Sequence, residues 1–377
     1  MPPIRSLIRP EKQNMRRALT LWSAAACAVL CLASCSISDI APDAAKAHHT
    51  ATGFRNNYPH PGQQSFWKWR WEKLRDGMPR KPAAGYHFDT VTTDVAALYN
   101  PSVTWVGHAT LLVRVGGLNI LTDPHFTQRA SPLPFAGPKR VVAPAIKLAA
   151  LPHIDAVLIS HNHDDHLDRP TVTALAAQTG GSPKFYIGLG LGKWFRELGI
   201  TNVEELDWWE AGSLAGVRFH FVPVQHWSAR TPWDTNQILW GGFVVEHPSL
   251  RFFFAGDSGY SRDFQDIAQR FGPIDLAAIP IGAYAPRWFM QAHHVDPDEA
   301  VQIHLDLKAR YSLAIHWGTF DDLTDESLYD PPVMLRAALV ERGLDTADFW
   351  VFKHGESRSL AFLRGSDAGE SRAAPSP

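Results

Sequence analysis

Apolar and polar residues alternate in short runs through the middle of the chain, and this pattern predicts β-strands. One run extends from Trp105 to Val115, breaks at two glycines, and resumes from Leu118 to Asp123. This predicts a hairpin whose second strand ends in an aspartate. The same order returns at residues 242–246 and 250–257. Strand, turn, apolar strand and acidic residue thus occur twice, which indicates a degenerate internal duplication.

Between the strands lie stretches in which apolar residues have helical spacing. We expect helices over residues 169–178, 191–198, 264–270, 297–308 and 332–342. A strand-rich pattern that occurs twice and is interrupted by such helices predicts an α/β fold. The expected architecture is an αββα sandwich, with two β-sheets face to face and helices on the outside.

The N-terminal residues have the pattern of a secretory signal. Met15 is followed by two arginines and by an apolar run over residues 18–32, and Leu32-Ala33-Ser34-Cys35 closes the run. This ending resembles the lipobox of bacterial lipoproteins, which implies acylation of Cys35. Met15 is a candidate for the true start, and a simple cleaved signal or a membrane anchor are the alternatives. We therefore expect residues 1–35 to be a signal peptide of an exported membrane lipoprotein, held at the outer membrane and facing the periplasm.

The remaining chain divides by composition. Residues 36–65 are polar and are interpreted as a tether, residues 66–366 as the folded domain, and residues 367–377 as a disordered tail. Residues 66–81 mix aromatics with six Lys or Arg residues against two acidic ones. This segment suits a membrane interface, or equally a helix whose tryptophans pack on the domain.

Overall composition limits the chemistry. The 377 residues are 45% apolar, enough for a large core, and a net charge of −2 provides no global basic field for nucleic acid. All three cysteines lie within the first 35 residues. A metal site in the domain must therefore use His, Asp or Glu ligands.

The clearest chemical signal is the segment at residues 161–168, which reads His-Asn-His-Asp-Asp-His-Leu-Asp after an apolar run. In an extended loop, alternate side chains point the same way, so His161 and His163 can bind one ion. Asp165 and His166 follow where the chain turns toward a helix, and they can serve a second ion. Imidazole and carboxylate groups in this mixture are typical of borderline divalent metals.

Further ligands for such a centre stand at later strand ends. His226 follows one strand, Asp257 follows a wholly apolar strand, and His316 follows another. Burial of an unpaired aspartate is costly, so a cation near Asp257 is its natural partner. Taken singly, each residue has another interpretation, as a core histidine bonded to backbone or as an aspartate that caps a turn.

The order HxHxDH, then His, Asp and His, resembles the signature of the metallo-β-lactamase superfamily. The resemblance implies one metal held by His161, His163 and His226. It implies a second held by Asp165, His166 and His316, with Asp257 bridging the two. Asp123 matches an acidic residue that supports a ligand histidine from outside the coordination shell.

Longer motifs point to one branch of that superfamily. They are Thr104–Thr110, Gly137–Arg140, Phe252–Asp257, Arg270–Pro273, Ile279–Tyr284, Pro286–Met290, His294–Pro297 and Ala314–Thr319. Over roughly residues 55–365 the chain resembles the N-acylphosphatidylethanolamine-hydrolysing phospholipases D. Asp164 and His293 depart from the mammalian member, which has Tyr and Gln there, and this leaves the headgroup preference open.

The resemblance implies a phospholipid substrate and a phosphodiesterase reaction that yields phosphatidic acid and N-acylethanolamine. Two zinc ions would supply a metal-bound hydroxide, although these ligands also suit iron or manganese. Asp165 and Asp257 would act as ligands in catalysis, and His294 is a candidate proton donor or phosphate contact. His294 is equally interpretable as a residue that merely precedes a helix.

Two other classes of function remain open from the sequence. One is a different hydrolase on the same scaffold, such as a lactonase, a β-lactamase or a nuclease, because fold does not fix substrate. The other is a non-catalytic lipoprotein that binds metal or lipid. Nothing in the sequence specifies an oligomeric state.

Overall fold

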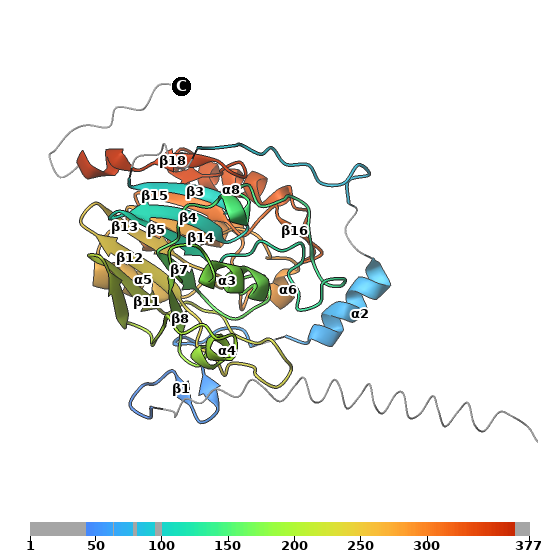
Figure 1. Cartoon of the computed structure of the whole chain (residues 1–377). Helices are drawn as coiled ribbons and strands as arrows, with labels where there is room; N and C mark the ends of the chain where they lie inside the picture. Colours follow the sequence, from blue (N-terminus) through green and yellow to red (C-terminus); the bar gives the residue numbers. More distant parts are fainter. Residues whose placement is uncertain (1–42, 63, 78–80, 95–99, 366–377) are drawn as a thin grey trace, which may run out of the picture.

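A computed structural model describes residues 43–62, 64–77, 81–94 and 100–365 (Figure 1). The signal peptide, Cys35 and the C-terminal tail lie outside the described residues. Among the residues that are described, no helix is both long and apolar enough to cross a membrane.

The first half of the domain forms a seven-stranded sheet with the order β18-β3-β4-β5-β7-β8-β9. Its strands are β3 (Ser102–Gly107), β4 (Thr110–Val115), β5 (Leu118–Thr122), β7 (Ala156–Ile159), β8 (Lys184–Gly188), β9 (Val203–Leu206) and β18 (Ser357–Ser359). Strands β18 to β5 pair antiparallel, and β5 to β9 pair parallel.

The second half forms another seven-stranded sheet, with the order β10-β11-β12-β13-β14-β15-β17. Its strands are β10 (Ala211–Leu214), β11 (Val217–Val222), β12 (Gly242–His247), β13 (Leu250–Phe254), β14 (Leu276–Pro280), β15 (Tyr311–Ile315) and β17 (Phe349–Trp350). Strands β10 to β13 pair antiparallel, and β13 to β17 pair parallel. The two halves thus follow the same plan.

Helices α3 (Arg169–Ala176) and α4 (Gly192–Glu197) pack on the outer face of the first sheet, and α5 (Asp263–Phe271), α7 (Pro297–Asp306) and α8 (Asp330–Glu341) lie on the side of the second. Helix α2 (Phe66–Asp76) lies apart from the sheets beside the short α6 (Arg287–Met290), and 3-10 turns occur at Leu148–Ala150 and Ala361–Gly365. The five helices expected from the sequence begin and end within two residues of their predicted bounds. Helix α7 begins sharply because Asp296 and Glu299 form a capping box around Pro297.

The strand alternation decides which layer each side chain enters. Leu111 and Val113 of β4 join the core between the two sheets, together with Phe254 of β13, whereas Phe253 points the other way and contacts Phe264 of α5. Leu112, which points the other way, joins a second core under α3 and α4 with Phe195. Helices α5 and α7 add residues to the core on the far side of the second sheet. The expected αββα sandwich is confirmed.

The expected tether at residues 36–65 is partly wrong. Strands β1 (His49–Thr50) and β2 (Gly53–Phe54) form a small hairpin that packs on the domain, and Phe54 is buried in the main core. His48 and His49 bind the buried carboxylate of Asp207. The polar composition suggested a solvated segment because the sequence does not reveal that these histidines have a distant carboxylate partner.

The run from Trp105 to Val115, expected to be one strand, is two. Strands β3 and β4 are joined by a tight turn at His108 and Ala109, and His108 has a left-handed backbone with φ 55°. Apolar residues continue on both sides of the turn, so the alternation conceals it. This turn places His108 at an end of the sheet, where the metal-binding candidates also lie.

Candidate metal centre

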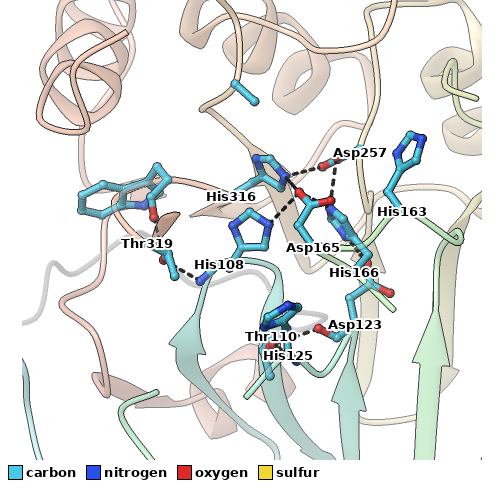
Figure 2. Close-up of polar contacts among 12 residues, drawn as sticks. His108, Thr110, Asp123, His125, His163, Asp165, His166, Asp257, His316 and Thr319 are labelled. Atoms are coloured by element: carbon cyan, nitrogen blue, oxygen red, sulfur yellow. Dashed lines mark hydrogen bonds and ion pairs between the residues drawn. The ribbon is translucent and has the colours of Figure 1, made fainter. Parts of the chain in front are cut away.

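The seven candidate ligands meet at one edge of the sandwich, although they come from four separate loops. Figure 2 labels His163, Asp165, His166, Asp257 and His316. The loop after β7 carries His161, His163, Asp165 and His166 from the first sheet. The loops after β11, β13 and β15 carry the other three from the second sheet: His226, Asp257 and His316. The site therefore lies where the two sheets face each other.

One donor set consists of His161, His163 and His226, each with a ring nitrogen within 4.8 Å of the others. The distance from His226 Nε2 to His163 Nδ1 is 3.2 Å. Two nitrogen ligands of one tetrahedral zinc ion, at bonds of 2.0–2.1 Å, are separated by about 3.3 Å. This set therefore fits a single ion of that size.

A second donor set surrounds Asp165. Its Oδ2 lies 3.4 Å from His166 Nε2 and 3.3 Å from His316 Nε2. The sequence predicted these three residues as ligands of the second metal, and the structure brings them together.

Asp257 lies between the two sets. Its Oδ2 is 3.0 Å from His166 Nε2, and its Oδ1 is 3.1 Å from His316 Nε2. The same Oδ2 is 3.9 Å from His161 Nε2 and 4.0 Å from His226 Nε2. One carboxylate thus contacts both groups of imidazoles, as a bridging ligand must.

The protonation of the first donor set and of Asp257 suits a cation, whereas the carboxylates of Asp257 and Asp165 outweigh burial and raise the pKa of His166 and His316. Burial lowers the pKa of His161, His226 and His163, to about 4 for His163, so these rings are neutral near pH 7 and can coordinate. Burial alone would raise the pKa of Asp257, but His166 and His316 hold it well below its usual range. The buried Nε2 atoms of His161 and His163 have no hydrogen-bond partner. Unpartnered donors around a buried carboxylate fit divalent metal ions.

Asp123, at the end of β5, orients two of the histidines. Its Oδ2 accepts from His166 Nδ1 at 2.7 Å and from Ser160 Oγ at 2.5 Å. Ser160 Oγ also lies 2.8 Å from His161 Nδ1. These contacts leave the Nε2 atoms of both rings directed at the site, which is the supporting role expected for Asp123.

Gly256, directly before Asp257, permits the close approach of the two sheets at this edge. It has φ 61°, and a Cβ atom there would lie 2.5 Å from Ser160 Cβ. A side chain at this position would collide with the serine that orients His161. The chain that follows β13 must therefore have glycine at position 256 for Asp257 to reach the site.

His226 and His294 are linked through the segment after α6. His226 Nδ1 donates to the backbone oxygen of His293 at 2.9 Å, which leaves His226 Nε2 free to bind an ion. His294 Nδ1 lies 3.9 Å from Asp257 Oδ2 and has no hydrogen-bond partner. Burial lowers the pKa of His294 to about 4. His294 therefore stands at the centre itself, whereas Asp296 is the residue that caps α7.

His108 is a site residue that sequence reasoning missed. Its Nε2 lies 3.1 Å from Asp165 Oδ2, and the centroids of the His108 and His316 rings are 4.0 Å apart (Figure 2). Its backbone is fixed by Thr319 Oγ1, which accepts from His108 N, and by His316 N, which donates to His108 O. The sequence signal for His108 was its place in the motif Thr104–Thr110, which supports the family resemblance but assigns no role to this histidine.

Arg230 is another residue that sequence reasoning missed. It binds the loop after β7 on the side away from the candidate ligands. Its Nη1 donates to the backbone oxygens of Asn162 at 3.0 Å and Leu167 at 2.8 Å, and its Nη2 lies 2.6 Å from Asp164 Oδ1. A cavity of about 640 Å³ adjoins this clamp and is lined by Asn162, Asp164 and Trp194 among others. None of the seven candidate ligands lines it.

This fold and these clustered donors define a metal-dependent hydrolase. Residues 118–317 match the model of the "Beta-lactamase superfamily domain". The chain is 42% identical over 251 residues to N-acyl-phosphatidylethanolamine-hydrolyzing phospholipase D 1 of Caenorhabditis elegans, over 63% of this chain and 70% of that protein. It is 37% identical over 224 residues to the mitochondrial enzyme of that name in Saccharomyces cerevisiae, over 58% of this chain and 47% of that protein.

A solved structure supports the fold independently. The isothiocyanate hydrolase from Delia radicum gut bacteria aligns with a TM-score of 0.54 at 20% identity, over 68% of this chain and 98% of that one. The chain belongs to the β-lactamase superfamily, in the branch that includes the N-acylphosphatidylethanolamine-hydrolysing phospholipases D. The resemblance expected from the sequence is confirmed.

Proposed function

We propose that this chain is a dinuclear phosphodiesterase of phospholipase D type, which hydrolyses N-acylphosphatidylethanolamine-like lipids to phosphatidic acid and N-acylethanolamine. One observation carries the proposal: Asp257 contacts both donor sets in a chain 42% identical to an enzyme named for this reaction. We further propose zinc as the metal, because the donors are only imidazole and carboxylate groups and one pair has the spacing of a tetrahedral site.

The residues of the chain have distinct tasks in this proposal. His161, His163 and His226 hold one ion, Asp165, His166 and His316 hold the other, and Asp257 joins them. Two bound divalent ions lower the pKa of a water molecule and neutralise charge on a phosphoryl group. His294 faces Asp257 from the side of the segment after α6 and is placed to meet a phosphoryl oxygen or to give a proton to the departing alcohol.

A lipid-panel assay with metal analysis tests the proposal. The purified full chain should contain two metal ions and release N-acylethanolamine from vesicles of N-acylphosphatidylethanolamine. It should release choline from phosphatidylcholine more slowly. Turnover only of lactones, β-lactams or nucleic acid would replace this proposal with another hydrolase. Bound metal without turnover of any of these would indicate a binding lipoprotein.

The location of the enzyme is a separate proposal. The sequence around Cys35 supports lipid attachment, which would keep the protein at a membrane, where its substrate is concentrated. Metabolic labelling with a fatty acid, compared between the wild type and Cys35→Ala, tests it. Label in the wild type and none in the variant is expected; equal label in both would refute acylation at Cys35.

A further inference from the structure

Helix α2 presents an apolar stripe to solvent. Trp67, Trp71 and Leu74 are 79%, 63% and 77% exposed, and their spacing of four and then three residues places them on one face. Large exposed side chains grouped in this way mark an interaction surface. We call these three residues the α2 stripe.

The opposite face of α2 is firmly seated on the domain. Trp69, about 200° around the helix from Trp67, is buried and stacks on Phe289 with ring centroids 5.0 Å apart. Trp69 Nε1 donates to Asp325 Oδ2 at 2.8 Å, and Lys73 Nζ lies 2.8 Å from the other oxygen of Asp325. These contacts of Trp69 and Lys73 fix the orientation of α2, so the stripe on the opposite face points to solvent.

Cations flank the stripe. The helix has four cationic side chains, of which Lys73 and Arg75 are already engaged by Asp325 at 2.8 Å and Asp76 at 2.6 Å. Attraction to acidic lipid therefore depends on Arg70 and on Lys68, which lies 3.9 Å from Glu72. Arg70 is exposed next to Trp71, and Lys68 lies 4.2 Å from the Trp288 ring with most of its side chain in solvent. A helix with Trp and Leu on one face and Lys or Arg beside it is typical of helices that lie in a bilayer interface.

The seat of α2 is connected to the metal centre through α6. Phe289 belongs to α6, which lies beside α2 (Figure 1). The backbone oxygen of Met290, the last residue of α6, accepts from the backbone N–H groups of both His293 and His294. The surface that holds α2 is therefore continuous with the turn that carries His294.

We propose that the α2 stripe docks the domain onto an anionic phospholipid bilayer, with its tryptophans at the level of the headgroups. The aromatic residues supply apolar burial, and the cations supply attraction to acidic lipid. This goes beyond the proposed function, because it requires neither a particular substrate nor acylation at Cys35.

Bromolipid quenching tests the docking in the full chain. Vesicles contain equal parts of brominated phosphatidylcholine and phosphatidylglycerol, and bromine quenches only tryptophans that enter the bilayer. Every protein carries Trp22→Phe, which removes the tryptophan of the leader. The reporter variant is Trp67→Phe/Trp71→Phe, which keeps the surface apolar but removes its two indoles. The matched control is Trp233→Phe, because Trp233 is 58% exposed and lies in a loop away from α2 in the sequence.

We expect vesicles to quench the parent protein and the control equally, and the reporter variant to lose most of this quenching. Quenching should also weaken on vesicles of brominated phosphatidylcholine alone. Equal quenching of all three proteins would overturn the proposal, as would bound protein with no quenching or failure to bind these vesicles. Self-association that Trp67→Ser/Trp71→Ser abolishes, without quenching, would instead assign the stripe to a second copy of the chain. The vesicles contain no N-acylated lipid, so the result is independent of the catalytic assay.

Discussion

Asp257 is the residue on which the chemistry of the site depends most, because its two oxygens approach histidines of both donor sets. Asn has nearly the same shape as Asp but has no charge and one fewer oxygen ligand. We expect Asp257→Asn to reduce hydrolysis on the order of 10³-fold or more, since metal assistance contributes several kcal/mol. Activity and metal content are the measurements, with circular dichroism as the control for folding. Unchanged activity would refute the bridging role.

His108 was not among the residues predicted from the sequence, and it contacts the candidate ligand Asp165. Its imidazole lies 3.1 Å from Asp165 Oδ2 and holds that carboxylate toward His316. We expect His108→Ala to weaken metal affinity or activity about 10–100-fold, as loss of a residue behind a metal ligand usually does. His108→Gln keeps an N–H donor and should recover part of this loss.

Metal titration of the three proteins separates this role from simple packing. If His108 served only in packing, His108→Ala would lower the free energy of unfolding but leave metal affinity unchanged. His108→Gln would then show no difference from His108→Ala in metal affinity.

Candidate ligands could be predicted from the sequence where each one directly follows an apolar strand. Each of His226, Asp257 and His316 follows an apolar strand, and a polar group in that position needs a partner. Ser160 and Arg230 were not predictable, because they act on neighbouring ligands and on backbone oxygens. Such contacts leave no periodic trace in the sequence.

At the scale of elements, the N-terminal hairpin β1-β2 depends on one buried carboxylate. Asp207 is 1% exposed and binds His48 at 2.6 Å, His49 at 2.9 Å and Lys46 at 2.6 Å. Burial opposes ionisation, but these three partners hold the pKa of Asp207 below its usual range. The charged form is therefore the one that the fold stabilises.

This gives a pH-dependent prediction. Because the pKa of Asp207 is lower in the folded chain, its contribution is present above the ordinary value, about 3.9, and is lost as pH falls through the folded value. Asp207→Asn should lower the free energy of unfolding by about 1–3 kcal/mol at pH 7. The gap from wild type should narrow below about pH 4. Denaturant titrations at several pH values measure it, and a gap that does not change with pH would contradict the assignment.

Elements with strong periodicity were predicted well, and short ones were not. Helices such as α3 and α7 have apolar spacing and clear start signals, so their bounds followed from the sequence. The two-residue strands β1 and β2 have no such pattern and form because distant residues bind them. The turn at His108 was missed for the opposite reason, since the apolar pattern continues through it.

At the scale of the whole molecule, the metal centre joins the two sheets. One sheet contributes the loop after β7, and the other contributes His226, Asp257 and His316. Repetition of strand order in the sequence predicted two similar sheets, and the polar strand ends predicted where they meet. The exact approach of the sheets was not predictable, because it depends on close packing such as that of Gly256 against Ser160.

Ions bound between the sheets should therefore stabilise the fold as well as enable hydrolysis. With free metal at about a hundredfold excess over Kd, binding to the folded chain alone contributes roughly 2.7 kcal/mol. Chelation should lower the free energy of unfolding by about this amount for wild type and by less for Asp257→Asn, which lacks one bridging oxygen. Denaturant unfolding of the chelated protein, reconstituted in turn with zinc, iron or manganese, measures the effect and ranks the metals. Equal stability with and without metal would mean that the donors are already satisfied without an ion, which the unpartnered Nε2 atoms of His161 and His163 argue against.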